Sequence, residues 1–394
     1  MLRQKLLEGL TTADAEAFAA AHPQPPKLFS HNPTANPKGV TNNCEICTRN
    51  SHLQCSLCKR TYYCCEEHQA MDWNSVHRKI CPFIQVLRSP SPILSTQEQR
   101  AIRAEMVANT KKFVLSVCQE EAQRHLNENN PELAHPSALQ ALRYAADVYG
   151  NTALELVPPY LLLAEANIAA ELYDKAQEHL CQAKWILLQH PDADPNLRSQ
   201  HSRNFGRLCL AQKKYDKALR HFSSDVYFTA QLKGPDHIQT SIGLYLIGIV
   251  FIEKADHESA VALFEKVLAV WTPFLQNCLT PVFDGGKVAL PSDWDQSIQK
   301  IGQQILKKIV QNQKEMHGAV QIAVAQAIFA EGLLNCVIGD WSNAFKLLVQ
   351  ANQMFEVTAG SEHTLTRESH RYLQLAQRMK SASIADDEAE LSFE

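Results

Sequence analysis

The sequence predicts a mostly α-helical protein in which a small metal-stabilised module precedes an α-solenoid of paired helices. Eight cysteine and histidine residues with the spacing of metal ligands lie between positions 44 and 81. From residue 95 to residue 379, apolar residues recur with a helical period and without strand-like alternation. Within that second part, similar segments recur every 42 residues, which is typical of a stacked repeat architecture.

Length and composition limit the possible functions. The chain has 394 residues, enough for two or three domains, and 45% of them are hydrophobic, enough for a sizeable core. The formal net charge of −4 argues against nucleic acid or an anionic membrane as a partner. The N-terminal residues lack a secretory signal, and the longest apolar run, 242–252, is too short to cross a bilayer. We therefore expect an intracellular protein without a membrane partner.

Residues 1–43 are predicted to form a short helix followed by a linker. The linker, residues 21–42, contains the stretch PQPPKLFSHNP with four prolines, which a helix does not tolerate in its interior. The first metal-stabilised domain is therefore expected to begin at residue 44.

Cysteine is distributed unevenly along the chain. Seven of the 12 cysteines lie in residues 44–81, and the other five are scattered singly through helix-like sequence. This distribution favours a metal site in a reducing compartment, the cytoplasm or nucleus, over a secreted disulfide framework. Zinc takes four sulfur or nitrogen ligands, and a two-residue spacer lets one turn present two thiolates to one ion. The window therefore predicts two structural Cys₃His zinc sites, built from Cys44, Cys47, Cys55, Cys58, Cys64, His68, His77 and Cys81.

The order of these residues resembles the MYND zinc finger. The pieces that carry the resemblance are CEIC, CSLC, YYCCEEHQ, DW and HRKIC, all within residues 44–81. The family pairs its ligands crosswise, so the resemblance implies two interleaved sites. The first site would consist of Cys44, Cys47, Cys64 and His68, and the second of Cys55, Cys58, His77 and Cys81.

One position departs from the family pattern, which usually has cysteine where this chain has His68. Histidine is an ordinary zinc ligand, so we expect His68 to complete the first site. The alternative is that the neighbouring thiol of Cys65 takes its place.

The finger is predicted to bind a peptide. Both zinc sites are filled by protein ligands, whereas a catalytic zinc keeps one position open. The folded module has a net charge of about −1, because each Cys₃His site adds one negative charge, and this disfavours phosphate binding. In the MYND family a groove beside the second zinc takes short proline-containing peptides, and the resemblance places it at Ser56, Gln69 and Trp73. Trp73 has a second interpretation, as the aromatic side chain that covers the core of a small module.

The repeats follow a hinge at residues 89–92. Small residues recur at one position of the 42-residue frame, and each is followed four residues later by a large apolar residue; twelve residues earlier stands a second small residue. Small residues at both places let two antiparallel helices pack closely. This pattern resembles the tetratricopeptide repeat in a form similar to the repeats of kinesin light chains. The small residues are Ala176, Ala218, Ala260 and Ala344, preceded by Ala164, Gly206, Gly248 and Gly332, and a weaker earlier unit holds Ala138, Leu142 and Ala145.

The frame is predicted to break once. Residues 272–292, with TPVFDGGKVALP, are expected to form a loop, followed by a long helix from Trp294 to about Met316. Residues 368–379 are predicted to cap the open end of the stack. Residues 380–394 are predicted to form an acidic disordered tail.

This architecture favours a non-enzymatic adaptor. Stacked helix pairs form an extended protein-binding surface, and the sequence has no Gly-rich phosphate loop, nucleophile elbow or convincing acid–base pair. The enzymatic alternative is a SET-and-MYND lysine methyltransferase, but 43 residues before Cys44 are too few for the first half of its SET domain, and its Asn-His-Ser-Cys motif is missing. A nuclear transcriptional corepressor adaptor is a further alternative, although no basic import cluster is visible.

The order of finger, hinge and repeats resembles the zinc finger MYND domain-containing proteins of motile cilia and sperm flagella. That resemblance implies an adaptor in the cytoplasm and axoneme that works beside other tetratricopeptide proteins and axonemal dynein. The residues alone predict a scaffold of two separate modules, in which the finger binds a peptide and the repeats bind a larger protein.

Overall fold

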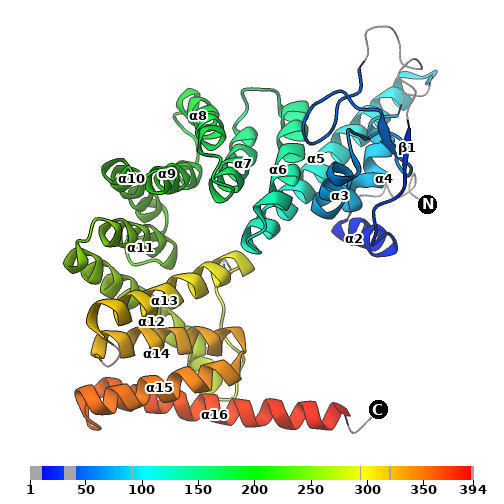
Figure 1. Ribbon diagram of the computed structural model, residues 1–394. Helices are drawn as coiled ribbons and strands as arrows, with labels where there is room; N and C mark the ends of the chain where they lie inside the picture. Colours follow the sequence, from blue (N-terminus) through cyan, green and yellow to red (C-terminus); the bar gives the residue numbers. More distant parts are fainter. Residues whose placement is uncertain (1–10, 31–40, 90–92, 293, 319–320, 392–394) are drawn as a thin grey trace. The chain divides into compact units, whose positions relative to one another are not determined.

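Two compact units divide the chain, residues 1–212 and residues 213–394. The computed structural model describes residues 11–30, 41–89, 93–292, 294–318 and 321–391. Residues 90–92 of the predicted hinge at 89–92 and residues 31–40 of the predicted linker at 21–42 therefore lie outside the described residues. Figure 1 shows the ribbon and its labels. The first unit contains α2 (Thr12–Ala21), β1 (Leu28–Ser30), β2 (Leu53–Cys55), β3 (Tyr62–Tyr63), α3 (Glu66–Asp72), the π-helix η2 (Trp73–His77), α4 (Arg78–Leu87), α5 (Gln97–Asn127), α6 (Pro131–Tyr149), the 3₁₀ turn η3 (Leu154–Leu156), α7 (Val157–Ala169), α8 (Tyr173–Gln189) and α9 (Pro195–Ala211). The second unit contains α10 (Tyr215–Lys233), α11 (Ile238–Glu253), α12 (His257–Phe283), α13 (Gln296–His317), α14 (Ile322–Ile338), α15 (Trp341–Ala359) and α16 (Thr364–Leu391).

A three-stranded antiparallel sheet with strand order β1-β2-β3 opens the first unit. The linker prediction for residues 21–42 was wrong at residues 28–30, because Leu28–Ser30 pair with β2 as an edge strand. Prolines 25 and 26 hold the preceding chain extended, and an edge strand tolerates such an approach because no further strand needs their missing N–H groups.

Helix α4 carries the finger into the repeats. It contains Cys81, one of the predicted zinc ligands, and its Phe83 and Ile84 are fully buried in one core with Val114 of α5 and Ala145 of α6. The finger and the first helices therefore share a hydrophobic core. The two predicted modules are therefore in direct contact.

The backbone repeats with the same frame as the sequence. The turns inside successive helix pairs contain a residue with positive φ, and these residues are separated by 42 positions or by twice 42. A residue in the left-handed region ends a helix and reverses the chain tightly. The 42-residue repeat therefore begins one unit earlier, with the helices α5 and α6. Ala122 and Ala134 lie 42 residues before Ala164 and Ala176, and both are fully buried. Ala138 and Ala145 of the predicted weaker unit are also buried. The turn residues are Asn129 (φ 59°), Glu171 (60°), Lys213 (58°), Ala255 (59°) and Gly339 (91°).

Small residues permit close helix packing in the second unit, as predicted. A Cβ atom added to Gly248 of α11 would lie 2.7 Å from the ring of Phe264 on α12. A Cβ atom added to Gly332 of α14 would lie 3.0 Å from Leu348 on α15. Phe264 and Leu348 are the large residues four positions after Ala260 and Ala344, and both are fully buried.

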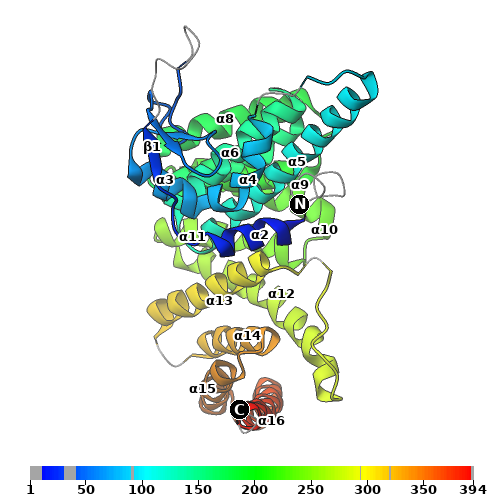
Figure 2. The ribbon, with the colours of Figure 1, turned by 90° about the vertical axis from the view of Figure 1, so that its right-hand side faces the viewer.

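The predicted loop over 272–292 was wrong in its first half, because α12 continues to Phe283 with Pro273 and Pro281 inside it. Leu275, Leu279 and Val282 keep a helical spacing and are buried, and each such side chain stabilises by about 1.5–3 kcal/mol. Together the three side chains contribute about 4.5–9 kcal/mol, which offsets the cost of about 3 kcal/mol for each of the two prolines. Figure 2 shows this end of α12 in yellow-green. The next helix, α13, resumes the 42-residue repeat. Gly302 lies 42 residues after Ala260, and Leu306, four residues later, is fully buried.

The C-terminal helix α16 runs to Leu391, so the predicted disordered tail is helical in its backbone over most of its length. Alanine, glutamate and leucine in that stretch are good helix formers, whereas the prediction of disorder relied on its net negative charge. Within the described residues, no helix is both long and apolar enough to cross a membrane.

Candidate metal centre

Two groups of four cysteine and histidine side chains lie in the finger, and within each group the ligand atoms are all within 4.8 Å of one another. The grouping agrees with the crosswise pairing that the sequence predicts. Each group joins a Cys-x-x-Cys turn to ligands that follow it in sequence, so the two metal sites interleave. The first group is Cys44, Cys47, Cys64 and His68; the second is Cys55, Cys58, His77 and Cys81.

The first group has the dimensions of a zinc site. In a tetrahedral site with ordinary zinc–ligand lengths, two sulfurs lie about 3.8 Å apart and a sulfur and a nitrogen about 3.5 Å apart. Cys47 Sγ lies 3.6 Å from Cys64 Sγ, and Cys44 Sγ lies 3.5 Å from His68 Nδ1. Cys65 Sγ lies 3.8 Å from Cys64 Sγ but outside the group, so His68 remains the predicted ligand.

The second group is more deeply enclosed. Its four members are all buried, and Cys58 Sγ lies 3.7 Å from His77 Nε2. Thiolates buried this deeply need a cation to compensate their charge. The residues present therefore fit a second zinc ion, which would crosslink the sheet to the start of α4.

The two Cys-x-x-Cys turns share one backbone conformation. The residue after each second cysteine, Thr48 or Lys59, has a positive φ of 59° or 54°. Its N–H donates to the carbonyl of the first cysteine, Cys44 or Cys55, at 3.0 Å. The turn aims both thiols of a pair to the same side, which a single metal ion requires. Threonine is β-branched and rarely adopts this φ, so the turn is held by its surroundings.

A buried tyrosine–aspartate pair supports His77 from behind. Tyr63 OH donates to Asp72 Oδ2 at 2.6 Å, and Asp72 Oδ2 lies 3.7 Å from His77 Nδ1. Burial, reinforced by Asp72, raises the pKa of Tyr63 well above its ordinary value, so the phenol keeps the proton that it donates. The Asp72 carboxylate thus faces the far side of the His77 ring at ion-pair distance, beyond hydrogen-bond length.

Glu45, between the first two cysteines, attaches the finger to α6 and to the end of α4. Its carboxylate forms ion pairs with Arg88 and with Arg143, the latter at 2.5 Å, and it accepts from Gln140 Nε2 at 2.8 Å. Burial alone would raise the pKa of Glu45, but Arg88, assisted by Arg143 and Gln140, holds that pKa below its ordinary value. The sequence gives no sign of this role, because no local pattern reveals partners such as Gln140 and Arg143 that lie 95 and 98 residues away.

A second polar contact joins η2 to α5 and α6. Ser75 Oγ donates to the carbonyl of Leu133 at 2.6 Å and lies 2.6 Å from Ser137 Oγ. The carbonyl of Ser75 lies 3.0 Å from Nε2 of the buried His125. Together with Glu45, this contact satisfies polar groups that the shared core would otherwise bury without partners.

Comparison with known families agrees with this geometry. A family model of the MYND finger matches residues 44–81, and a family model of the tetratricopeptide repeat matches residues 197–272.

Residues 44–81 are a MYND finger, and tetratricopeptide repeats follow it.

The MYND finger also accounts for the curated relatives. Residues of Egl nine homolog 1 from Homo sapiens are 44% identical over 39 positions, 10% of this chain and 9% of that protein. Programmed cell death protein 2 from Mus musculus is 40% identical over 38 positions, 10% of this chain and 11% of that protein. The chain thus spans about a tenth of the length of the curated relatives that it matches.

Two solved structures show a weak similarity to the chain. One is a putative kinesin light chain from Podosopora anserina with nearly identical TPR-like repeats: 14% identity, 61% of this chain, 94% of that chain and a TM-score of 0.37. Another is BtubC from P. vanneervenii: 14% identity, 68% of this chain, 87% of that chain and a TM-score of 0.39. With TM-scores below 0.5, neither likeness carries an argument about this chain.

The predicted peptide-binding residues of the MYND finger lie in different surroundings. Trp73 is fully buried in the finger core, and its Nε1 has no hydrogen-bond partner among the described residues. Gln69 is also buried, and its Nε2 donates to the carbonyl of Pro26 at 2.5 Å. Ser56, in the second Cys-x-x-Cys turn, is half-buried. Trp73 thus lies in the finger core, and the amide of Gln69 already binds the backbone carbonyl of Pro26. The peptide-binding role of Ser56, Gln69 and Trp73 stays a prediction.

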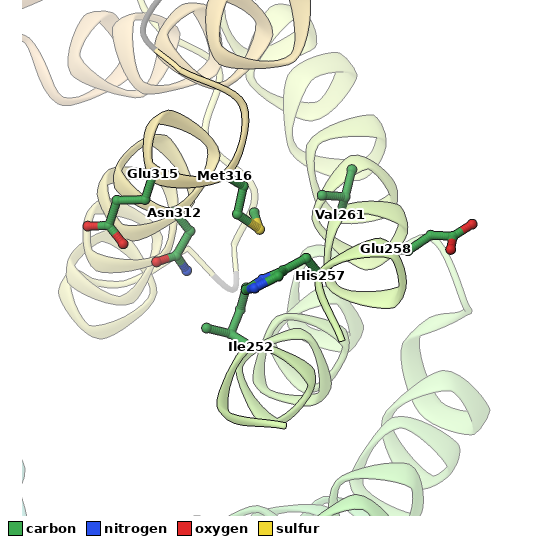
Figure 3. A pocket seen from close by; sticks show the side chains of 7 residues that line it. All are labelled: Ile252, His257, Glu258, Val261, Asn312, Glu315 and Met316. Carbon is green, nitrogen blue, oxygen red and sulfur yellow. The ribbon is translucent and has the colours of Figure 1, made fainter. Parts of the chain in front are cut away.

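A separate hollow of about 560 Å³ lies in the second unit between α11, α12 and α13. Its surface is mostly apolar, with Ile252, Val261 and Met316 among the lining residues. Figure 3 shows the carboxylates of Glu258 and Glu315 pointing away from the space between these helices. The hollow therefore offers surface for contact and brings no acid–base pair together.

Proposed function

We propose that the protein is a non-enzymatic adaptor of the motile cilium or sperm flagellum, where it links a partner held by its MYND finger to a second protein held by its repeats. A MYND finger and tetratricopeptide repeats are protein-interaction domains, which supports an adaptor role. The ciliary setting, with axonemal dynein and other tetratricopeptide proteins as partners, follows from the resemblance in domain order.

One observation carries the adaptor interpretation. The finger is fixed to α5 and α6 through α4, Glu45 and Ser75, so it is held on the first helices of the repeats and does not swing on a tether. Partners bound to the finger and to these helices would be held in one fixed geometry. Simultaneous binding of two partners then depends on the fixed distance between their sites as well as on effective concentration.

The metal centres support the same proposal. Each group supplies four protein ligands, and the second group is entirely buried. Zinc in such a site holds the fold of the finger, whereas catalysis needs an open ligand position. The proposed role of zinc is therefore structural.

The proposal is tested by capturing the full-length tagged protein from ciliated or spermatogenic cells and identifying its partners by mass spectrometry. Trp185 and Leu188 on α8 are 49% and 65% exposed, so Trp185→Asp with Leu188→Asp tests the repeats without entering the core. Gln69→Ala tests the finger, because Trp73→Ala would disturb the core instead. Recovery of axonemal dynein and tetratricopeptide proteins, reduced by either variant, supports the proposal. Recovery of chromatin corepressors would replace it with the nuclear alternative.

A further inference from the structure

Residues 23–30 of this chain lie on the edge of the MYND finger. Leu28, Phe29 and Ser30 form β1 and pair antiparallel with Cys55, Gln54 and Leu53 of β2, respectively. On its other side β2 pairs with β3, so β1 completes the sheet. An exposed strand edge is a common site for binding an extended peptide, because its backbone groups are ready to pair. Here a segment from outside the finger already occupies that edge.

A finger side chain also binds the backbone of this segment. Gln69 Nε2, on α3, donates to the carbonyl of Pro26 at 2.5 Å, and Gln69 is only 4% exposed. A proline pair holds the chain extended in advance, so less conformational entropy is lost when the segment binds. Gln69 thus uses a buried amide to bind a backbone carbonyl 43 residues earlier in the chain.

The side chains of β1 alternate as a bound strand requires. Leu28 is half-buried and packs against the core that contains the zinc-ligating cysteines and Trp73. Phe29, the next residue, is 54% exposed. Phe18 of α2 packs against the same core. The inward position therefore takes one large aliphatic side chain, two residues after the second proline.

Helix α2 tethers the segment to the finger. Ala15 of α2 is buried in the core shared by α4 and the first repeat helices. Downstream, the chain re-enters the finger at residue 41. A segment held at both ends has a high effective concentration at its site, so even weak contacts keep it bound.

We propose that residues 23–30 are an internal ligand of the MYND finger, and that the finger binds an extended Pro-Pro-x-Leu segment of a partner protein after this internal ligand is displaced. The proposal rests on the adaptor function and adds its regulation: the peptide site is closed by default. The class of partner follows from the occupant. It combines a proline pair whose carbonyl Gln69 binds, one unconstrained residue, and an aliphatic residue that packs on the finger core while the backbone pairs with β2.

The test uses the full-length protein and a fluorescent synthetic peptide with the sequence of residues 22–30. Leu28→Glu removes the inward side chain of the internal ligand and leaves every finger residue unchanged. Phe29→Glu is the matched control, because that side chain is exposed. An internal competitor at millimolar effective concentration weakens external binding, so we expect Leu28→Glu to bind the peptide at least about tenfold more tightly than the wild type and Phe29→Glu. Fluorescence anisotropy measures the three dissociation constants.

Zinc content and circular dichroism establish that each variant is folded. If Leu28→Glu loses zinc, Leu28→Ala replaces it, with the same order of affinities expected. Folded, zinc-loaded Leu28 variants that bind the peptide no more tightly than the wild type would overturn the proposal. A wild-type dimer that exchanges β1 between copies, detected by sedimentation and crosslinking, would also overturn it. Because the probe is synthetic, these results stand whether or not cellular partners are captured, so failure of the adaptor function is seen separately.

Discussion

The MYND finger and the helix pair α11–α12 solve the same packing problem in different ways. In the finger, the interior consists largely of ligand side chains with Tyr63 and Trp73, and one acidic residue attaches it to its neighbours. In the helix pair, the missing side chain of Gly248 makes space for the ring of Phe264. The finger depends on metal and charge, whereas the helix pair depends on shape. The two regions should therefore fail under different perturbations.

Metal removal should separate the two regions most strongly. Structural zinc contributes about 10–16 kcal/mol to folding in zinc-finger peptides. Cys58→Ser, or a strong chelator, should unfold the finger and lower hydrogen-exchange protection in α4, α5 and α6, because these helices share its core, while α14–α16 stay protected. Cys181→Ser is the control, since Cys181 is exposed and belongs to neither ligand group. Unchanged protection in α5 and α6 would contradict the shared core.

Replacing the charge that attaches the finger should have the next largest effect. Glu45→Gln leaves Arg88 and Arg143 without their carboxylate. We expect a loss of about 2–3 kcal/mol in unfolding free energy, less than for a fully buried pair because both arginines are about a third exposed. Urea unfolding of the zinc-loaded protein measures this loss. Glu16→Gln is the control, because Glu16 is 66% exposed; an equal loss there would refute the special role of Glu45.

Filling the space at Gly248 tests the second region. The added methyl group of Gly248→Ala would lie 2.7 Å from Phe264, and overpacking of this kind costs about 1–3 kcal/mol. Phe264→Leu in the same chain should recover part of the loss, which a double-mutant cycle detects as coupling. Additive losses in thermal unfolding would show that the two residues are not packed against each other. Zinc content should stay unchanged throughout.

The smallest effect is expected at an exposed ion pair in the second unit. Lys266 Nζ lies 2.7 Å from Asp236 Oδ1, but the two side chains are 53% and 70% exposed. Asp236→Asn should change the unfolding free energy by less than about 1 kcal/mol, and the change should vanish at high salt. If Asp236→Asn lowered the unfolding free energy as much as Glu45→Gln does, this would contradict the idea that the burial of an ion pair determines how much its removal destabilises the protein.

The sequence was sufficient for features that depend on spacing. Ligand spacing predicts the eight cysteine and histidine ligands, the MYND resemblance implies how they are grouped, and small residues at 42-residue intervals predict the helix pairs. Features that depend on distant partners were not predictable. The sequence around Glu45, Ser75 and Leu28 does not reveal their contacts. Partners of Glu45 and Ser75 lie on α6, and Leu28 pairs with β2, so these contacts form only in the folded protein. Proline misled twice, at α12 and at β1, since burial and strand pairing outweighed its local preference.

The contacts of Glu45 also set an order of events during protein synthesis. Gln140 and Arg143 lie 95 and 98 residues after Glu45. At about 5–20 residues per second, translation reaches them about 5–20 s after it has made Glu45. Once Cys81 has also been made, the nascent finger has all eight predicted metal ligands, but the site on α6 where it will dock does not yet exist. Until α6 has been made, the growing chain therefore exposes the apolar α4 surface that α6 later covers.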